Sequence, residues 1–143
     1  MAVELYVNSL WTTEEAFNSD AAKPADAVWG TNVFASMAAA LNAVDEQTET
    51  IKVSSDVIET IAAEEKIVTL SKNLEIVGAG DSVVNVTLND GGYKQLIFAA
   101  ADGASDIAVK FSNINITAPK SQVIFGGAEY DAENNVTCSP LTA

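Results

Sequence analysis

The sequence has no arginine and no histidine, and its seven basic residues are all lysines: Lys23, Lys52, Lys66, Lys72, Lys94, Lys110 and Lys120. Histidine is the most frequent general base at neutral pH and the commonest nitrogen ligand for metals. Arginine binds carboxylates and phosphates through paired hydrogen bonds. Few enzymes work without both residue types, so the composition predicts a protein that is not an enzyme, with no catalytic, cofactor-binding or metal-binding residues.

Cysteine and long apolar runs are equally scarce. The single cysteine, Cys138, allows no internal disulfide and cannot form a zinc site, so we expect it to be a small buried apolar residue. No apolar run approaches the ~20 residues of a membrane-spanning helix, which predicts no membrane insertion. The segment MAVELYVNSL has no basic stretch followed by a long apolar one, so we expect no secretion signal within the chain.

Positive charge is also in short supply. Twenty acidic residues give the chain a net charge of −13, which argues against nucleic acid as a partner because its phosphates are negative as well.

The chain is 48% hydrophobic and its mean hydropathy is +0.17, which is too apolar for a wholly disordered chain. With 143 residues it is expected to form a single domain.

The chain divides into two regions near residue 50. Residues 1–49 contain an opening β-prone run, VELYV, and a predicted capping helix within TNVFASMAAALNAV, whose expected N-cap is Thr31 or Asn32. The apolar residues of this helix recur at three- and four-residue spacing on one face, and they are Phe34, Met37, Ala38, Leu41 and Val44. Residues 50–143 consist of short β-prone runs separated by turn residues.

Four of these runs are related to one another. They are TIKVSSD from Thr50, NLEIVGAG from Asn73, QLIFAAAD from Gln95 and QVIFGGAE from Gln122. Each begins with a polar and then an aliphatic residue, and their alignment places Val53, Ile76, Phe98 and Phe125 at one position. A second family, within IVTL, NVTL, NIT and NVTC, aligns Thr69, Thr87, Thr117 and Thr137.

Repeats of roughly 20–30 residues with two or three short strands each are typical of a β-solenoid. We therefore expect an all-β fold, a parallel β-helix of about four coils with an N-terminal capping helix. The segment SDIAVKFSNINIT fits two registers, either on DSVVNVTL through Ile107, Val109 and Phe111, or on IVTLSKNLEIV through Ile114 and Ile116. A doubly wound α/β fold is less compatible, because it needs a helix of ten or more residues between successive strands.

The stretch from Thr50 to Val84, which includes TIKV and KNLEIVGAGDSVV, is similar to the entry into the pectin-lyase-like superfamily. The resemblance extends over residues 32–143 and is of the bacterial surface-protein kind. It implies a right-handed parallel β-helix. It does not carry over the activities of the enzymes in that superfamily, because the arginines and histidines they use have no counterpart in this chain.

The turn Gly78-Ala79-Gly80 follows a β-prone run, as a phosphate-binding loop does. A dinucleotide fingerprint would need a third glycine at Val83 and a helix beginning there, whereas the run VVNVTL is β-branched. We therefore expect a tight corner that uses the conformational freedom of glycine.

Asn85, Asn115 and Asn135 each begin an Asn-x-Thr triplet, the acceptor sequence for N-glycosylation. Because the triplets recur at matching repeat positions, a row of stacked, hydrogen-bonded side chains explains them better.

Two acidic groups offer oxygen ligands of the kind that calcium binds, and they are Asp102 with Asp106, and Glu129 with Asp131 and Glu133. No loop matches a known calcium-binding motif, so a solvated acidic surface is the expected role. Paired carboxylates for glycoside hydrolysis would need a separation of ~5–9 Å across a cleft, which acids two coils apart reach by chance.

The aromatic residues Trp11, Phe17 and Trp29 lie near the predicted helix, and we expect them to cover the open end of the strand stack. Tyr93 lies in a glycine turn and is the better candidate for a surface contact.

Repeat architecture without the usual catalytic residue types favours a non-catalytic extracellular or cell-surface domain with a structural or adhesive role. The expected partner is a glycan or a host or bacterial surface protein, and an uncapped coil ending in NNVTCSPLTA would allow end-to-end self-association. Two alternatives remain open. One is an N-terminal fragment of a polysaccharide-active lyase or esterase whose active site lies on coils outside this chain, and the other is a phage fibre component.

Overall fold

A computed structural model describes residues 3–60, 65–89, 94–101, 103–104, 107–117, 121–125, 127–130 and 136–139. Most of the regular structure is β. In chain order the elements are β1 (Glu4–Val7), α1 (Glu14–Asn18), β2 (Val33–Phe34), α2 (Met37–Ala43), β3 (Thr50–Val53), β4 (Val57–Thr60), β5 (Glu65–Leu70), β6 (Leu74–Gly78), β7 (Val84–Asn89), β8 (Lys94–Ala100), β9 (Val109–Ser112), β10 (Ile114–Thr117), β11 (Ser121–Phe125), β12 (Gly127–Tyr130) and β13 (Val136–Ser139).

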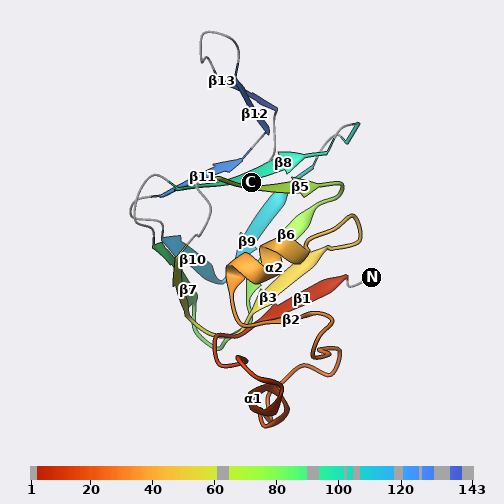
Figure 1. The fold of residues 1–143 in the computed structure, drawn as a ribbon, viewed down its shortest axis with the longest axis vertical. Coiled ribbons are helices and arrows are strands. Elements are labelled where there is room, and N and C mark those ends of the chain that lie inside the picture. Colours follow the sequence, from red (N-terminus) through yellow and green to blue (C-terminus); the bar gives the residue numbers. More distant parts are fainter. Residues whose placement is uncertain are drawn as a thin grey trace.

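The strands form three parallel sheets and one antiparallel hairpin. The first sheet has the order β2-β1-β3-β6-β9, the second β10-β7-β4 and the third β11-β8-β5. From β3 to β11 the chain therefore visits the first, second and third sheets in the same order three times. Figure 1 shows the three sheets around a common interior, with the hairpin of β12 and β13 projecting beyond β8 and β11.

The expectation of a mostly β fold with parallel strands is confirmed. Every strand pair in the three sheets is parallel. A doubly wound α/β fold does not fit, since in the described part of the chain no helix separates any two strands from β3 to β11. The chain makes three passes through the three sheets, and β1 adds a fourth level to the first sheet alone. The sequence predicted about four coils.

The predicted strand register is correct for one pair and wrong for another. Gln122 lies opposite Gln95 and Phe125 opposite Phe98, as the repeat alignment requires. Val53, however, lies opposite Gly78 instead of Ile76, a shift of two residues. The four aligned runs also belong to two sheets, because β3 and β6 are in the first and β8 and β11 in the third.

The threonine family divides in the same way. Thr87 and Thr117 are partners on β7 and β10, as expected. Thr69 instead lies on β5 opposite Ala99 of the third sheet. Thr137 lies on β13, where it faces Glu129 of β12 in the antiparallel hairpin, so the parallel repeat predicted for this segment is wrong there.

Neither register considered for SDIAVKFSNINIT is right, because the segment contributes to two sheets. Phe111 on β9 lies opposite Ile76 on β6, and Ile114 on β10 lies opposite Val84 on β7. Asn113 stands between the two strands with a positive φ of 54° and turns the chain from the first sheet to the second.

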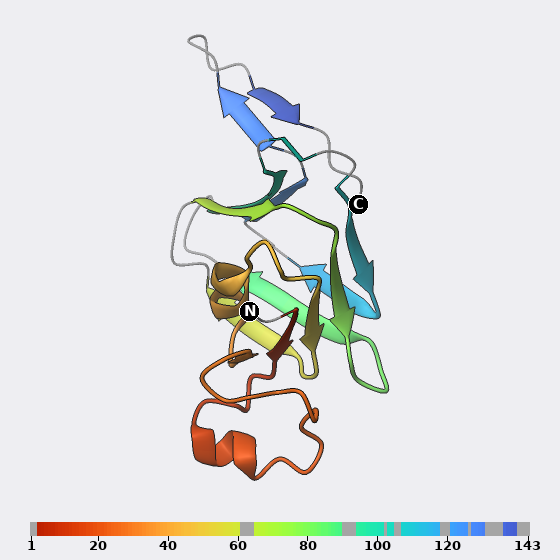
Figure 2. The same ribbon diagram turned by 90° about the vertical axis from the view of Figure 1, so that its right-hand side faces the viewer.

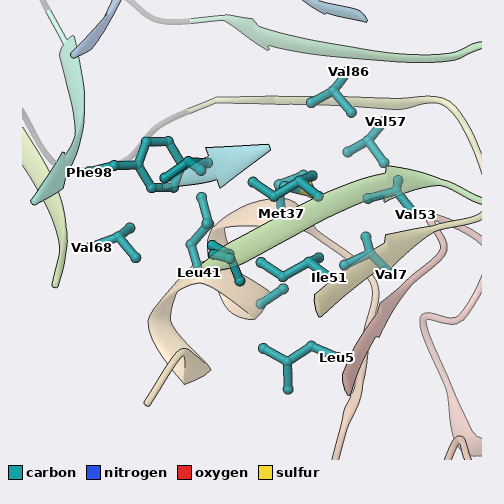
Figure 3. Close-up of a cluster of buried hydrophobic side chains, with 14 of the residues drawn as sticks. Leu5, Val7, Met37, Leu41, Ile51, Val53, Val57, Val68, Val86 and Phe98 are labelled. Atoms are coloured by element: carbon teal, nitrogen blue, oxygen red, sulfur yellow. The ribbon is translucent and has the colours of Figure 1, made fainter. Parts of the chain in front are cut away.

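The main core lies between the three sheets. Alternate side chains of the first sheet point into it, so Ile51, Val53 and Ile76 are each fully buried. Val86 of the second sheet and Phe98 of the third meet them from the other sides (Figure 3). Like positions stack on like positions, which excludes water from side chains that a single pass of the chain would leave exposed.

Helix α2 covers one end of this core. Its buried residues Met37, Ala40 and Leu41 belong to the same cluster as Leu5 and Ile51 (Figure 3). In Figure 2, the gold helix α2 lies at one end of the stacked strands and the dark teal β9 lies at the other. The expected capping helix is thus present, and it packs against β1 and β2.

The start of α2 differs from the prediction. The N-cap is Ser36, not Thr31 or Asn32, and its side chain accepts a hydrogen bond from the backbone N–H of Ala39. Phe34, assigned to the helix face, instead belongs to β2. The carboxylate of Glu59 on β4 also accepts hydrogen bonds from the N–H groups of Met37 at 2.7 Å and Ala38 at 2.6 Å. A residue distant in sequence thereby completes the cap.

Helices α1 and α2 have five and seven residues. Within the described ranges of the chain, no helix has the length and apolar character that crossing a membrane requires.

We expect Glu59→Ala to lower the free energy of unfolding by about 1–2 kcal/mol, because two backbone N–H groups at the start of α2 lose their acceptor. The free energy of unfolding of Glu59→Gln should lie between those of Glu59→Ala and the original protein, since a neutral amide oxygen still accepts a hydrogen bond. Urea unfolding followed by circular dichroism measures both changes.

The matched control is Glu46→Ala, which removes an exposed acid from the loop after α2. It should alter the free energy by no more than about 0.5 kcal/mol. Equal losses for the two alanine variants would contradict the capping role of Glu59.

Candidate functional site

The Gly78-Ala79-Gly80 turn is a structural corner, as expected, but for a different physical reason. Strand β7 follows the turn, so no helix begins there to hold a phosphate. Gly78 does not adopt a positive φ. Instead, a Cβ at this position would lie 1.9 Å from the carbonyl oxygen of Asn113. Glycine is required because the next pass of the chain crosses directly against it.

Asn113 holds this crossing in place. Its side-chain amide donates hydrogen bonds to the carbonyl oxygens of Gly78 at 2.8 Å and Gly80 at 3.2 Å. Its own carbonyl oxygen accepts a hydrogen bond from the N–H of Val84 at 3.1 Å. The side chain of one pass therefore satisfies carbonyl groups of the turn in the previous pass.

The predicted asparagine row is present over two passes. Asn115 on β10 lies opposite Asn85 on β7, and its amide donates to the Asn85 side-chain oxygen at 3.4 Å. The N–H of Asn85 in turn donates to the Asp56 carboxylate at 2.8 Å. Asn135 lies outside the described residues.

The aromatic residues form a second apolar cluster, but not at the predicted place. Trp11 and Phe17 meet edge to face with ring centroids 5.2 Å apart, and Phe17 lies 6.1 Å from Trp29. They pack with Tyr6 and Val33 on the outward face of β1 and β2, away from the main core. The prediction that they cover the open end of the stack is wrong, because α2 does so.

Of the other candidate residues, Tyr93, Asp102, Asp106, Asp131 and Glu133 lie outside the described residues. Glu129 and Cys138 belong to the terminal hairpin, where they lie opposite Thr137 and Ala128. Among the residues that the structure describes, no group of three or more acidic or cysteine side chains is arranged to hold a metal ion.

Sequence reasoning did not identify a shallow groove of about 580 Å³ at the first sheet. The groove lies where the chain enters β3, β6 and β9, so three segments distant in sequence contribute to it. Its lining residues are Glu49, Thr50, Lys72, Asn73, Leu74, Glu75, Ala108 and Lys110. A charged or polar residue, Glu49 or Asn73, precedes β3 and β6, but Ala108 precedes β9, so the sequence carries no signal common to the three segments.

The groove exposes both polar and apolar surface, and its charges balance, with two glutamates and two lysines among its lining residues. The Lys72 ammonium lies 3.6 Å from a Glu49 carboxylate oxygen, and both side chains are more than one third exposed, so this pair contributes little to stability. Glu75 and Lys110 are neighbours in register on β6 and β9. Asn73 anchors the groove floor by accepting a hydrogen bond from the N–H of Ala108 at 2.8 Å.

A second polar group lies on the same outward face, beside the groove. The Lys52 ammonium lies 3.2 Å from a Glu4 carboxylate oxygen and 5.8 Å from the centre of the Tyr6 ring. The Tyr6 hydroxyl donates to the other Glu4 oxygen. Burial raises the pKa of Tyr6 to about 12, with a further contribution from Glu4, and the hydrogen bond from Tyr6 lowers the pKa of Glu4.

The groove presents both hydrogen-bond donors and hydrogen-bond acceptors. Carboxylates, ammonium groups and a backbone-anchored amide form hydrogen bonds to hydroxyls and ionic groups of a ligand. Comparisons with protein-family models, curated proteins and solved structures gave no significant match to this chain.

We expect Gly78→Ala to destabilise the protein by about 2–3 kcal/mol or more, because the new methyl group would overlap the backbone of Asn113 and force the two passes apart. Chemical denaturation measures the loss. Gly80→Ala is the matched control, since the nearest atom to its Cβ is the Ser82 oxygen at 3.3 Å. Equal losses at both positions would show that the close crossing at Gly78 is not the cause.

We expect Tyr6 to make the protein sensitive to alkali. Its pKa is about 12 in the folded state and near 10 in an unfolded chain. The stabilisation that depends on the protonated hydroxyl is therefore complete below pH 10 and is lost as the pH rises to 12. The loss amounts to about 2 kcal/mol.

The measurement is the free energy of unfolding between pH 9 and 12 for the original protein and for Tyr6→Phe. Lysine titration affects both proteins, so only their difference reports on Tyr6. The advantage of the original protein should shrink across this range, and a constant difference would contradict the assignment.

Proposed function

We propose that this chain is a segment of a right-handed parallel β-helix that acts outside the cell as a structural and adhesive domain, and that it binds a glycan in the groove of the first sheet. The observation that carries the proposal is the order in which the chain visits its sheets. Three passes through the first, second and third sheets, all with parallel pairing, support a β-solenoid, because a solenoid repeats its strands in the same order on each coil.

The arrangement suits adhesion because it repeats side chains across a rigid surface. Neighbouring strands are about 4.8 Å apart, so residues in register form straight rows on the outward face of the sheet. Thr50, Glu75 and Lys110 make one such row, and the groove runs along it. An extended ligand that crosses the strands can meet a new polar side chain at each level.

The chemistry of the groove favours a glycan over a protein. Protein partners are held mainly by a few buried aromatic and arginine side chains. In the groove Leu74 is only 1% exposed and no aromatic side chain is present among the described residues of the lining, so charged, hydroxyl and amide groups lie beside the aliphatic surface of Ala108 and the lysines. Carboxylates and ammonium groups together can bind the donors and acceptors of sugar hydroxyls.

A glycan array tests this proposal. We expect the protein to bind a set of related glycans, and Lys110→Ser to weaken that binding by about tenfold because a charge-assisted hydrogen bond is lost. Lys23→Ser is the matched control, because it removes an exposed lysine near α1, away from the groove. Binding should be the same with calcium and with a chelator.

Two results would overturn the proposal. One is glycan binding that Lys110→Ser and Lys23→Ser reduce equally, and the other is the absence of binding to any glycan. Incubation with pectin or another polyuronate provides a further test, since release of cleaved or de-esterified product would favour the enzyme alternative. A stable trimer in solution would favour the fibre alternative.

A further inference from the structure

The two edges of the second sheet are protected very differently. At one edge, β4 carries Glu59, whose carboxylate binds the start of α2. At the other edge, β10 is the last strand of the sheet, and among the described residues β7 is its only strand partner. An edge strand exposes unpaired N–H and C=O groups that can pair with another strand.

Burial of side chains falls at the β10 edge. Val84 and Val86 on β7 are 4% and 1% exposed. Ile114 and Ile116 occupy the corresponding positions on β10 but are only half-buried. The apolar row that is shielded inside the stack is therefore partly open to water at its last level, where a further strand would cover it.

The edge strand β10 is not protected by charged side chains. Proteins commonly protect edge strands with charged residues, proline or bulges. The sequences of β10, INIT, and of its neighbour β7, VNVTLN, contain neither a charge nor a proline. In a chain with a net charge of −13, two β10 strands can pair without placing an acidic side chain of one edge strand against an acidic side chain of the other.

We propose that β10 is a self-association edge, at which the second sheet of one copy continues into the second sheet of a second copy. A two-fold axis beside β10 places the two β10 strands antiparallel and joins the identical edges by main-chain hydrogen bonds. Half-buried Ile114 and Ile116 of each copy are then covered by the partner. A second copy fits because its edge has the same register and the same lack of charge.

The first test is hydrogen exchange at about 5 µM and about 500 µM protein, together with light scattering. We expect a concentration-dependent dimer, with slower exchange of the amides of residues 113–117 at the higher concentration and unchanged exchange in α2. Added salt should strengthen the dimer because it screens repulsion between the acidic chains. A monomer at both concentrations, or new protection confined to other strands, would overturn the proposal.

A matched pair of variants provides the second test. Asn115→Lys places a lysine on the edge strand, and Asn85→Lys makes the same change one strand further in. Both variants remove the Asn115–Asn85 hydrogen bond and both reduce the net negative charge by one. A general charge effect would therefore make the two associate equally, and slightly more readily than the original protein.

Pairing at β10 predicts a different result. Asn115→Lys should weaken the dimer about tenfold or more, because it places a positive charge on each of the two paired edge strands. Asn85→Lys should dimerise like the original protein. Equal dimerisation of the two variants would overturn the proposal, and thermal unfolding checks that both variants are folded. Glycan binding in the groove is measured separately and is unaffected by either outcome.

Discussion

The parallel pairing of each strand with the strand one pass later is the constraint on which this structure depends. A single pass of the chain has no closed side, so its inward side chains would remain in water without the passes above and below. Stacking places Ile51 against Ile76 and Val57 against Val86, and each addition buries the level before it. The close crossing of Asn113 over Gly78 and the amide contact between Asn115 and Asn85 follow from this stacking.

Because each strand is covered by the strand of the next pass, the first and last strands of the stack need another partner. At one end α2 takes the place of a further pass, and Glu59 connects the helix to the sheet beneath it. At the other end β10 has an apolar row that is only partly shielded. The groove has a different origin, because it forms on the outward face, where the turns before successive strands stack without a core of their own.

The repeat pattern predicted the class of fold but not the assignment of strands to sheets. Residues alternate inward and outward with a period of two in all three sheets, so the local pattern is the same in each. A shift of two residues also leaves the same side chains facing inward, which explains why Val53 could be aligned with Ile76 although it lies opposite Gly78. The pair Phe98 and Phe125 was predicted correctly because its flanking residues, Gln-aliphatic-Ile-Phe, match at every position.

By itself, the sequence determined that the chain is strongly acidic, lacks arginine and histidine and contains many short repeated strands. Composition and periodicity are properties of the chain alone. It also marked Gly78, Asn85 and Asn115 as positions that matter. Only the tertiary structure decided why they matter and which residues meet. The Cβ that Gly78 lacks would overlap Asn113, and Glu49, Glu75 and Lys110 share one groove. These contacts join residues one or two passes apart, and their partners depend on how many residues each turn contains before the next strand begins.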